Sequence, residues 1–271
     1  MTAWRLGTVP YLNALPLVEG LAGRGDVQLV PDVPARLAPR LRAGELDAAL
    51  CSAVELFRAP PLGWLDGPAI TSEGPVRSIL LFLRTPPARV RSLALDRSSR
   101  SAAALACTCL SEFFDVTRAR VFECEPDAPL AAIDADAILR IGDPALAAHC
   151  DGAAARAGRT ALDLGELWTE RTALPFVYAL WLVRPSLPPA EAAALRATLL
   201  SARDAGLARR DELARAFAAR AGLPADACAD YLQRRIGYDL GEAEREGLAF
   251  FGRLAHRWGL VDSPLLPAPL A

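Results

Sequence analysis

The sequence predicts an α/β protein of two lobes, in which mixed sheets are flanked by helices and a ligand cleft lies between the lobes. Three observations lead to this fold class. Short apolar runs typical of strands alternate with Ala- and Leu-rich stretches typical of helices. The chain of 271 residues is longer than one compact core usually requires. From Pro188 onward the pattern becomes helical throughout.

The expected elements begin with a βαβαβ unit, which favours parallel strand pairing. Its strands are expected at 6–9, 27–30 and 46–51, and its helices at 11–20 and 34–43. Later strands are expected at 79–83, 93–95, 121–124, 137–141 and 176–183, with helices at 102–114 and after Gly142. The middle of the chain, roughly residues 86–183, forms a βα unit of its own, which we interpret as a second lobe inserted into the first lobe. We therefore predict one lobe from residues 1–84 plus 185–271 and a second from residues 85–184.

Composition and charge exclude several classes of function. The formal net charge is -2, so no broad basic face is available for nucleic acid. All basic residues are Arg, which excludes Schiff-base chemistry on Lys. The six Cys form no C-x-x-C pair, so we expect reduced thiols and no zinc site. With no apolar run suited to a signal or a membrane span, we expect a cytoplasmic monomer or homodimer away from the membrane.

Ligands in sheets of this kind bind beyond the carboxyl ends of the strands. The turns to consider follow Val9, Leu50, Leu65, Leu95 and Ile141. Polar residues in or near these turns have ordinary structural explanations as well. An Asn can bond its own turn, a Ser run before a helix can cap it, and an Asp before Pro is a typical N-cap.

Five segments, in order along the chain, resemble the chorismate dehydratase family of the futalosine route to menaquinone. They are residues 9–17 (VPYLNALPL), 67–81 (with GPVRSILL), 95–101 (LDRSSRS), 141–146 (IGDPAL) and 168–181 (with TALPFVYALW). The resemblance implies a fold like that of type II periplasmic binding proteins. It also implies a cofactor-independent and metal-free enzyme that converts chorismate to 3-[(1-carboxyvinyl)oxy]benzoate and water. Four positions depart from the family pattern: Ser101 for Thr, Ala102 for Ser, Ala173 for Gly, and Arg140 in an apolar strand.

The resemblance also assigns the candidate site. Asn13 and Ser78 are the expected catalytic contacts. Arg100 has two alternatives, a two-pronged bond to a carboxylate or a surface ion pair. For the serine turn, capping and carboxylate binding are compatible, because a helix N-terminus offers several N–H groups. The expected substrate-binding residues are Tyr11, Ser52, Ser98, Ser99, Arg100, Ser101, Gly142, Asp143 and Phe176.

No residue stands out as the base that removes the proton. The two histidines, His149 and His256, lie away from the candidate turns. His149 is expected to be exposed, and His256, on the amphipathic C-terminal helix, is expected to be structural or exposed. Asp143 is a possible base, but its position before Pro144 favours the cap. We therefore hypothesise that the enolpyruvyl carboxylate of the substrate takes the proton, while Asn13 and Ser78 hold the substrate in place.

Three other functions stay open at this point. A solute-binding protein of the same fold would bind chorismate without converting it. The sister lyase of the futalosine pathway would require a catalytic His near the first turn, where this chain has Asn13. The effector-sensing half of a regulator would require a helix-turn-helix region, which we do not find before the lobes.

Overall fold

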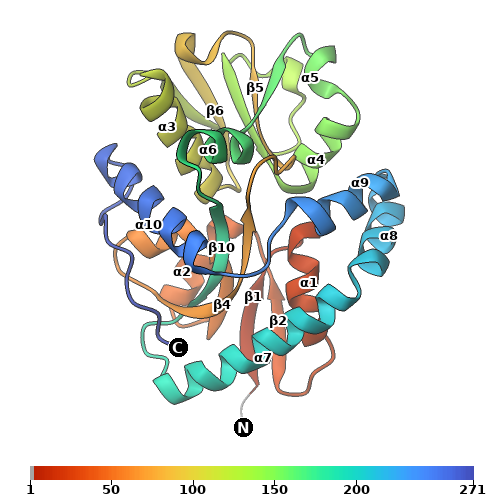
Figure 1. Ribbon diagram of the computed structural model, residues 1–271, viewed down its shortest axis with the longest axis vertical. Helices are drawn as coiled ribbons and strands as arrows, with labels where there is room; N and C mark the ends of the chain where they lie inside the picture. The colour runs from red at the N-terminus through yellow and green to blue at the C-terminus, as the bar shows by residue number, and fades with distance from the viewer. Residues whose placement is uncertain (1–2) are drawn as a thin grey trace.

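The computed structural model describes residues 3–271 and contains two five-stranded sheets in two lobes, stacked along the long axis of the molecule (Figure 1). The first lobe, lower in Figure 1, holds the sheet of order β2-β1-β3-β10-β4. The second lobe holds the sheet of order β7-β6-β8-β5-β9. The fold class predicted from the sequence is confirmed.

The first sheet combines parallel and antiparallel pairs. β1 pairs in parallel with β2 and β3, and β10 runs antiparallel between β3 and β4. Helices cover the sheet, so its central strands are buried on both faces and consist of continuous apolar runs. Its strands are β1 (Trp4–Thr8), β2 (Val27–Pro31), β3 (Ala48–Ser52), β10 (Phe176–Val183) and β4 (Gly63–Ser72).

The second sheet has the same plan, with β6 parallel to β7 and β8, and β5 antiparallel to β8 and β9. Its strand β5 illustrates why these residues form a strand. Leu80 and Phe82 enter one apolar cluster, and the alternating Ile79, Leu81 and Leu83 enter another. Its strands are β7 (Arg120–Cys124), β6 (Ser92–Asp96), β8 (Ala137–Ile141), β5 (Ile79–Leu83) and β9 (Thr160–Asp163).

The helices pack on the sheets and along the edge where the lobes meet. Helix α7 packs on α1 and β4, α2 packs on β3, and α10 packs on β10 and α3. The α-helices are α1 (Leu15–Val18), α2 (Pro34–Arg42), α3 (Ser101–Phe114), α4 (Gly142–Cys150), α5 (Ala153–Arg156), α6 (Leu164–Thr172), α7 (Pro189–Ala208), α8 (Arg210–Ala221), α9 (Ala225–Asp230) and α10 (Glu242–Arg257). A π-helical turn spans Tyr231–Arg235, and 3-10 turns span Leu12–Ala14, Glu19–Leu21, Ala53–Phe57, Pro87–Arg89 and Leu130–Ala132.

The predicted lobe boundaries, at 84/85 and 184/185, do not match the sheets. β5 was expected in the first lobe and belongs to the second sheet, whereas β10 was expected in the second lobe and belongs to the first sheet. The chain crosses between the lobes at residues 73–78 and 173–175. The reason is that both strands are uniformly apolar and buried, so their composition does not indicate which sheet they join.

Two strands were not predicted from the sequence. β4 contains Gly67-Pro68, a pair that normally interrupts strands, and it tolerates them because its pairing with β10 is irregular. β9 has only four residues, none of them fully buried, so it lacks a clear apolar pattern.

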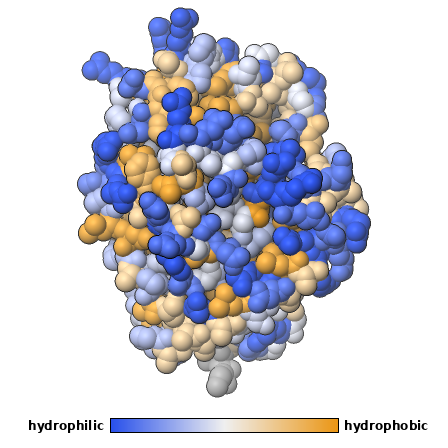
Figure 2. All heavy atoms as spheres, viewed as in Figure 1, coloured by the Kyte–Doolittle hydropathy of each residue, from blue (hydrophilic) through white to orange (hydrophobic). Residues whose placement is uncertain are grey.

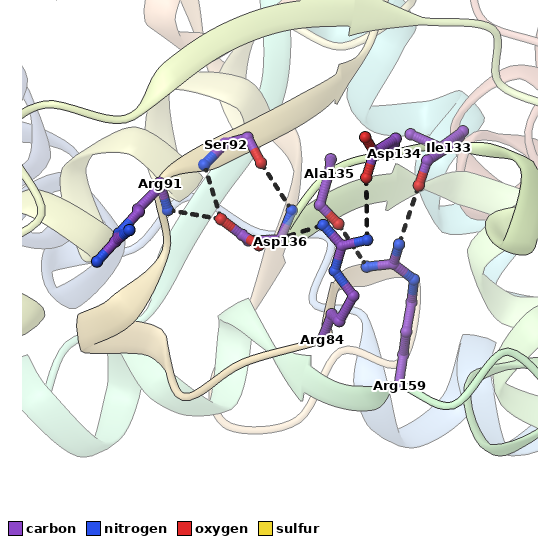
Figure 3. Close-up of polar contacts among 8 residues, drawn as sticks. All are labelled: Arg84, Arg91, Ser92, Ile133, Asp134, Ala135, Asp136 and Arg159. Atoms are coloured by element: carbon purple, nitrogen blue, oxygen red, sulfur yellow. Dashed lines mark hydrogen bonds and ion pairs between the residues drawn. The ribbon is translucent and has the colours of Figure 1, made fainter.

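A carboxylate joins the loops at the outer end of the second lobe (Figure 3). Asp136, directly before β8, accepts hydrogen bonds from the backbone N–H groups of Arg91 and Ser92 at 2.9 and 3.2 Å, and pairs with Arg84 at 3.3 Å. The guanidinium of Arg159 donates to backbone carbonyls beside it, including that of Ala135 at 2.9 Å. These bonds fix the starts of β6 and β8.

The surface is mixed in character. Figure 2 shows hydrophilic residues spread over most of the visible face, with smaller hydrophobic areas between them. Among the described residues, none of the helices is long and apolar enough to cross a membrane.

Candidate active site

A cavity of about 60 Å³ lies between the two sheets and is lined from both lobes. Its apolar walls come from strand ends of both sheets, among them Val9, Leu50, Ile70, Ile79 and Ile141. Its polar groups are Tyr11, Asn13, Ser52, Ser99, Arg100, Ser101 and Tyr178. Four of the five predicted turns contribute to it. The fifth, after Leu65, does not, because Leu65 lies inside β4.

Asn13 brings an unbonded amide oxygen to this cavity. It lies in the 3-10 turn after β1, and the turn is closed by a backbone bond from the Ala14 N–H to the Tyr11 carbonyl at 3.0 Å. The Asn13 Oδ1 is buried without a hydrogen-bond partner in the described part of the chain. The alternative that Asn13 bonds its own turn through this oxygen is therefore wrong. A buried acceptor of this kind costs about 1–3 kcal/mol until a ligand pairs with it.

Tyr11 forms a wall between the lobes. Its hydroxyl donates to Ser98 Oγ at 3.3 Å, and Ser98 Oγ donates to Asp96 Oδ1 at 2.5 Å. Burial raises the pKa of both Tyr11 and Asp96. The Tyr11 ring faces Gly142, where φ is +60° and an added Cβ would lie 3.1 Å from the ring. Gly142 is thus required both by its backbone conformation and by the ring against it.

The serine turn before α3 has three different roles. Ser99 Oγ accepts a hydrogen bond from the Ala103 N–H at 3.1 Å, which satisfies a donor of the first helical turn. Ser101 Oγ accepts one from the Val54 N–H at 3.2 Å, which links the lobes. Ser98 bonds Asp96 and Tyr11 and does not line the cavity.

Arg100 contributes to the cavity lining and is half-buried, and it also lines a second pocket beside Glu55 and Asp262. None of the ion pairs found among residues 3–271 involves Arg100, so the surface ion pair that the sequence left open is not formed. The guanidinium is therefore available to an anionic ligand.

Asp143 lies outside the cavity lining and is not the N-cap expected from the sequence. The cap position of α4 is Ile141, and the Asp143 carboxylate instead accepts a hydrogen bond from the Leu12 N–H at 3.0 Å. The helix starts two residues earlier than Asp143-Pro144 suggested, and the Asp143 side chain reaches across to the first lobe. Burial raises the pKa of Asp143 to about 6, although the Leu12 bond and the Arg220 charge oppose this.

Ser78 is buried beside the cavity lining but is not part of it. Its hydroxyl is 2.7 Å from the Tyr231 hydroxyl, and its carbonyl accepts a bond from the Gly142 N–H at 2.8 Å. Its role as a catalytic contact stays a prediction. Tyr231 was missed because the C-terminal helices carry no motif.

Phe176 also lies away from the cavity, in an aromatic cluster with Trp168 and Phe251 at ring distances of 5.3 and 4.9 Å. Tyr178, two residues further along β10, lines the cavity instead. Its hydroxyl shares a hydrogen bond with Ser72 at 2.9 Å. The two-residue period of a strand was the signal that could have indicated Tyr178.

Both histidines, His149 and His256, are exposed, as expected. Within the described chain no three His, Cys, Asp or Glu side chains are grouped so as to hold a metal. The polar groups at the cavity are thus amide, hydroxyl and guanidinium groups, which suit binding and orienting an oxygen-rich anion.

Comparison with known proteins identifies the family and the fold. A family model described as menaquinone biosynthesis matches residues 4–257. The chain is 32% identical, over 98% of both sequences, to a chorismate dehydratase of Thermus thermophilus. A solved structure from Archaeoglobus fulgidus gives a TM-score of 0.74 at 16% identity, covering 96% of this chain and 98% of that one.

The alkanesulfonate-binding protein of Xanthomonas axonopodis pv. citri, solved with MOPS, gives a TM-score of 0.72 at 19% identity, covering 100% of this chain and 98% of that one. The periplasmic aliphatic sulphonate-binding protein of Escherichia coli gives a TM-score of 0.65 at 18% identity, covering 99% of this chain and 93% of that one. All three structures share their fold with this protein. With the family match over almost its whole length, the chain belongs to the chorismate dehydratase family of menaquinone biosynthesis.

Proposed function

We propose that this protein is a chorismate dehydratase, a hydro-lyase that forms 3-[(1-carboxyvinyl)oxy]benzoate and water. The observation that carries the proposal is the cavity between the lobes, whose lining includes Asn13, three serines and Arg100. Within residues 3–271 the Asn13 amide oxygen has no hydrogen-bond partner, and Arg100 is in none of the ion pairs. Chorismate carries two carboxylates, a ring hydroxyl and an enol ether. Each has a complementary group in this set.

Binding begins with the two carboxylates. Arg100 is proposed to pair with one of them, supported by N–H groups at the start of α3. Asn13 and Ser52, at the ends of β1 and β3, approach from the other lobe. Holding the ring in one pose between the lobes contributes on the order of 7 kcal/mol to lowering the barrier.

The reaction removes a ring proton and the hydroxyl of the neighbouring carbon. The C–H electron pair forms the new ring double bond, the hydroxyl leaves and is protonated to water, and the ring becomes aromatic. We propose that the enolpyruvyl carboxylate accepts the ring proton and passes it to the departing hydroxyl. The support is the cavity lining itself, which includes no His, Asp or Glu among the described residues.

The test is to incubate the purified protein with chorismate and to follow the aromatic product by mass spectrometry. Wild type is expected to form the product, and Asn13→Ala to form it much more slowly. Binding without product would identify a solute-binding protein instead. An analogue esterified at the enolpyruvyl carboxylate should bind and remain unconverted, and its normal turnover would exclude the substrate as the base.

The compartment and assembly are further proposals. All six cysteines are free, which is typical of a reducing compartment, and we infer the cytoplasm. We also retain the expectation of a monomer or homodimer, which sedimentation analysis would decide.

A further inference from the structure

The π-helical turn near the C-terminus reaches back to the candidate site. Tyr231 begins this turn, its side chain is 1% exposed, and its hydroxyl is 2.7 Å from Ser78 Oγ. π-helical turns are rare and occur frequently at functional sites. A Phe would fill the same space without the cost of burying a hydroxyl, so the presence of a Tyr at this position suggests that its bond to Ser78 has a role.

The turn that begins at Tyr231 also packs against the 3-10 turn Leu12–Ala14, which carries Asn13. Burial raises the Tyr231 pKa, and side-chain hydrogen bonding to Ser78 and, to a smaller extent, to Asn13 opposes the rise. The Asn13 Oδ1 has no partner within residues 3–271, and Asn13 lines the cavity. Tyr231 therefore lies behind both candidate catalytic residues.

The turn is itself fixed to the crossover between the lobes. Asp230, directly before Tyr231, pairs with Arg77 and Arg235, each at 2.8 Å. Arg77 has a φ of +62°, an uncommon conformation for a residue with a side chain, and it precedes Ser78. The backbone N–H of Arg77 donates to the Asp163 carboxylate at 2.6 Å. Ser78 is thus held on one side by this crossover and on the other by Tyr231.

We propose that Tyr231 is a positioning residue for the dehydration, whose hydroxyl sets the orientation of Asn13 and Ser78. The proposal rests on the proposed function. It assigns a role to the C-terminal segment, which the sequence motifs do not cover. Tyr231 does not line the cavity, so it acts through its two neighbours and does not contact the substrate.

The experiment compares Tyr231→Phe with wild type in the chorismate assay. We expect kcat to fall about 10- to 100-fold, as when an orienting partner is lost, while KM changes less than about twofold. Tyr238→Phe is a matched control from the same segment. Its hydroxyl is buried and has no partner among the described residues, so removing it should leave kcat unchanged.

A double mutant separates positioning from general packing. If Tyr231 acts through Ser78, the variant carrying Tyr231→Phe and Ser78→Ala should be about as slow as the slower single variant. The proposal would be overturned if the fold-losses of kcat in the two single variants multiplied in the double variant, or if Tyr231→Phe kept the wild-type kcat. If Tyr231→Phe does not fold, Ser78→Ala removes the same hydrogen bond from the other side, and its wild-type kcat would overturn the proposal too.

Failure of the proposed function would be visible separately. If wild type forms no aromatic product, the dehydratase assignment fails, and the positioning role proposed for the dehydration fails with it. If wild type forms the product and Tyr231→Phe forms it at the same rate, only the positioning role fails.

Discussion

Replacing Gly142 by Ala should damage both stability and activity, for two reasons that can be separated. The backbone at Gly142 has a φ of +60°, which costs an Ala roughly 1–2 kcal/mol. The new Cβ would also lie 3.1–3.3 Å from three ring atoms of Tyr11. The ring must therefore shift by a few tenths of an ångström, and its bond to Ser98 shifts with it.

Gly152→Ala is the matched control for this prediction. Gly152 has a φ of +70°, but an added Cβ would find no atom within 4 Å. Both variants should lose about 1–2 kcal/mol, which corresponds to roughly 2–8 °C in Tm for a chain of this size. Only Gly142→Ala should also lose activity, because only there does the Tyr11 wall of the cavity move.

The assays are thermal unfolding and chorismate turnover of wild type and both variants. We expect kcat/KM to fall about tenfold or more in Gly142→Ala and to stay within twofold of wild type in Gly152→Ala, since small misplacements of positioning groups are costly. Full activity of Gly142→Ala, or an equal loss in both variants, would refute the role of the Tyr11–Gly142 contact.

Three further predictions concern charged groups. Arg100→Ala should raise KM for chorismate about 10- to 100-fold, while Arg97→Ala, on a surface ion pair, should not; equal KM values would contradict carboxylate binding. Because the Asp143 pKa is raised to about 6, protonation of Asp143 should contribute stability as the pH falls from 6 toward 4. Urea unfolding should therefore show wild type gaining stability relative to Asp143→Asn over this range, and a constant difference would contradict the raised pKa. Burial tends to raise the Asp136 pKa, but hydrogen bonds to Arg91 N–H, Arg84 and Ser92 outweigh it and lower the pKa. Asp136→Ala should therefore lower the free energy of unfolding by about 1–3 kcal/mol at pH 7, and by less as the pH falls through the lowered pKa. Asp134→Ala removes an exposed carboxylate and should lower it by under about 1 kcal/mol. Equal losses for the two variants in urea unfolding would reject the network in Figure 3.

The sequence predicted most of the fold because its strands have distinct patterns. β5, β8 and β10 were found at their correct bounds, since each is a buried run, apolar apart from Arg140 in β8, and is limited by polar, Gly or Pro residues. Sheet membership could not be predicted, because it depends on pairing between segments far apart in the chain. β10, for example, pairs with β3 more than a hundred residues earlier.

The site was predicted to the level of its turns, and less well at single side chains. Asn13 and Arg100 line the cavity because both follow strand ends, which the topology rule covers. Asp143 follows a strand end too, yet its carboxylate turns to Leu12, a contact that only the assembled lobes provide. Tyr231 lies in a helical segment without a motif, so only the three-dimensional arrangement brings it to Ser78.

The two crossings of the chain also bear on the order in which the protein folds. All strands of the second sheet lie between residues 79 and 163, so its pairs close comparatively short stretches of chain. The first sheet needs β10 between β3 and β4, and β10 lies more than a hundred residues after β3, so its pairing closes a longer stretch and is slower. We therefore expect pulsed hydrogen exchange during refolding to protect β5 and β8 before β3, and the opposite order would exclude this sequence of events. The second lobe, which is inserted into the sequence of the first, is then the one that becomes ordered first.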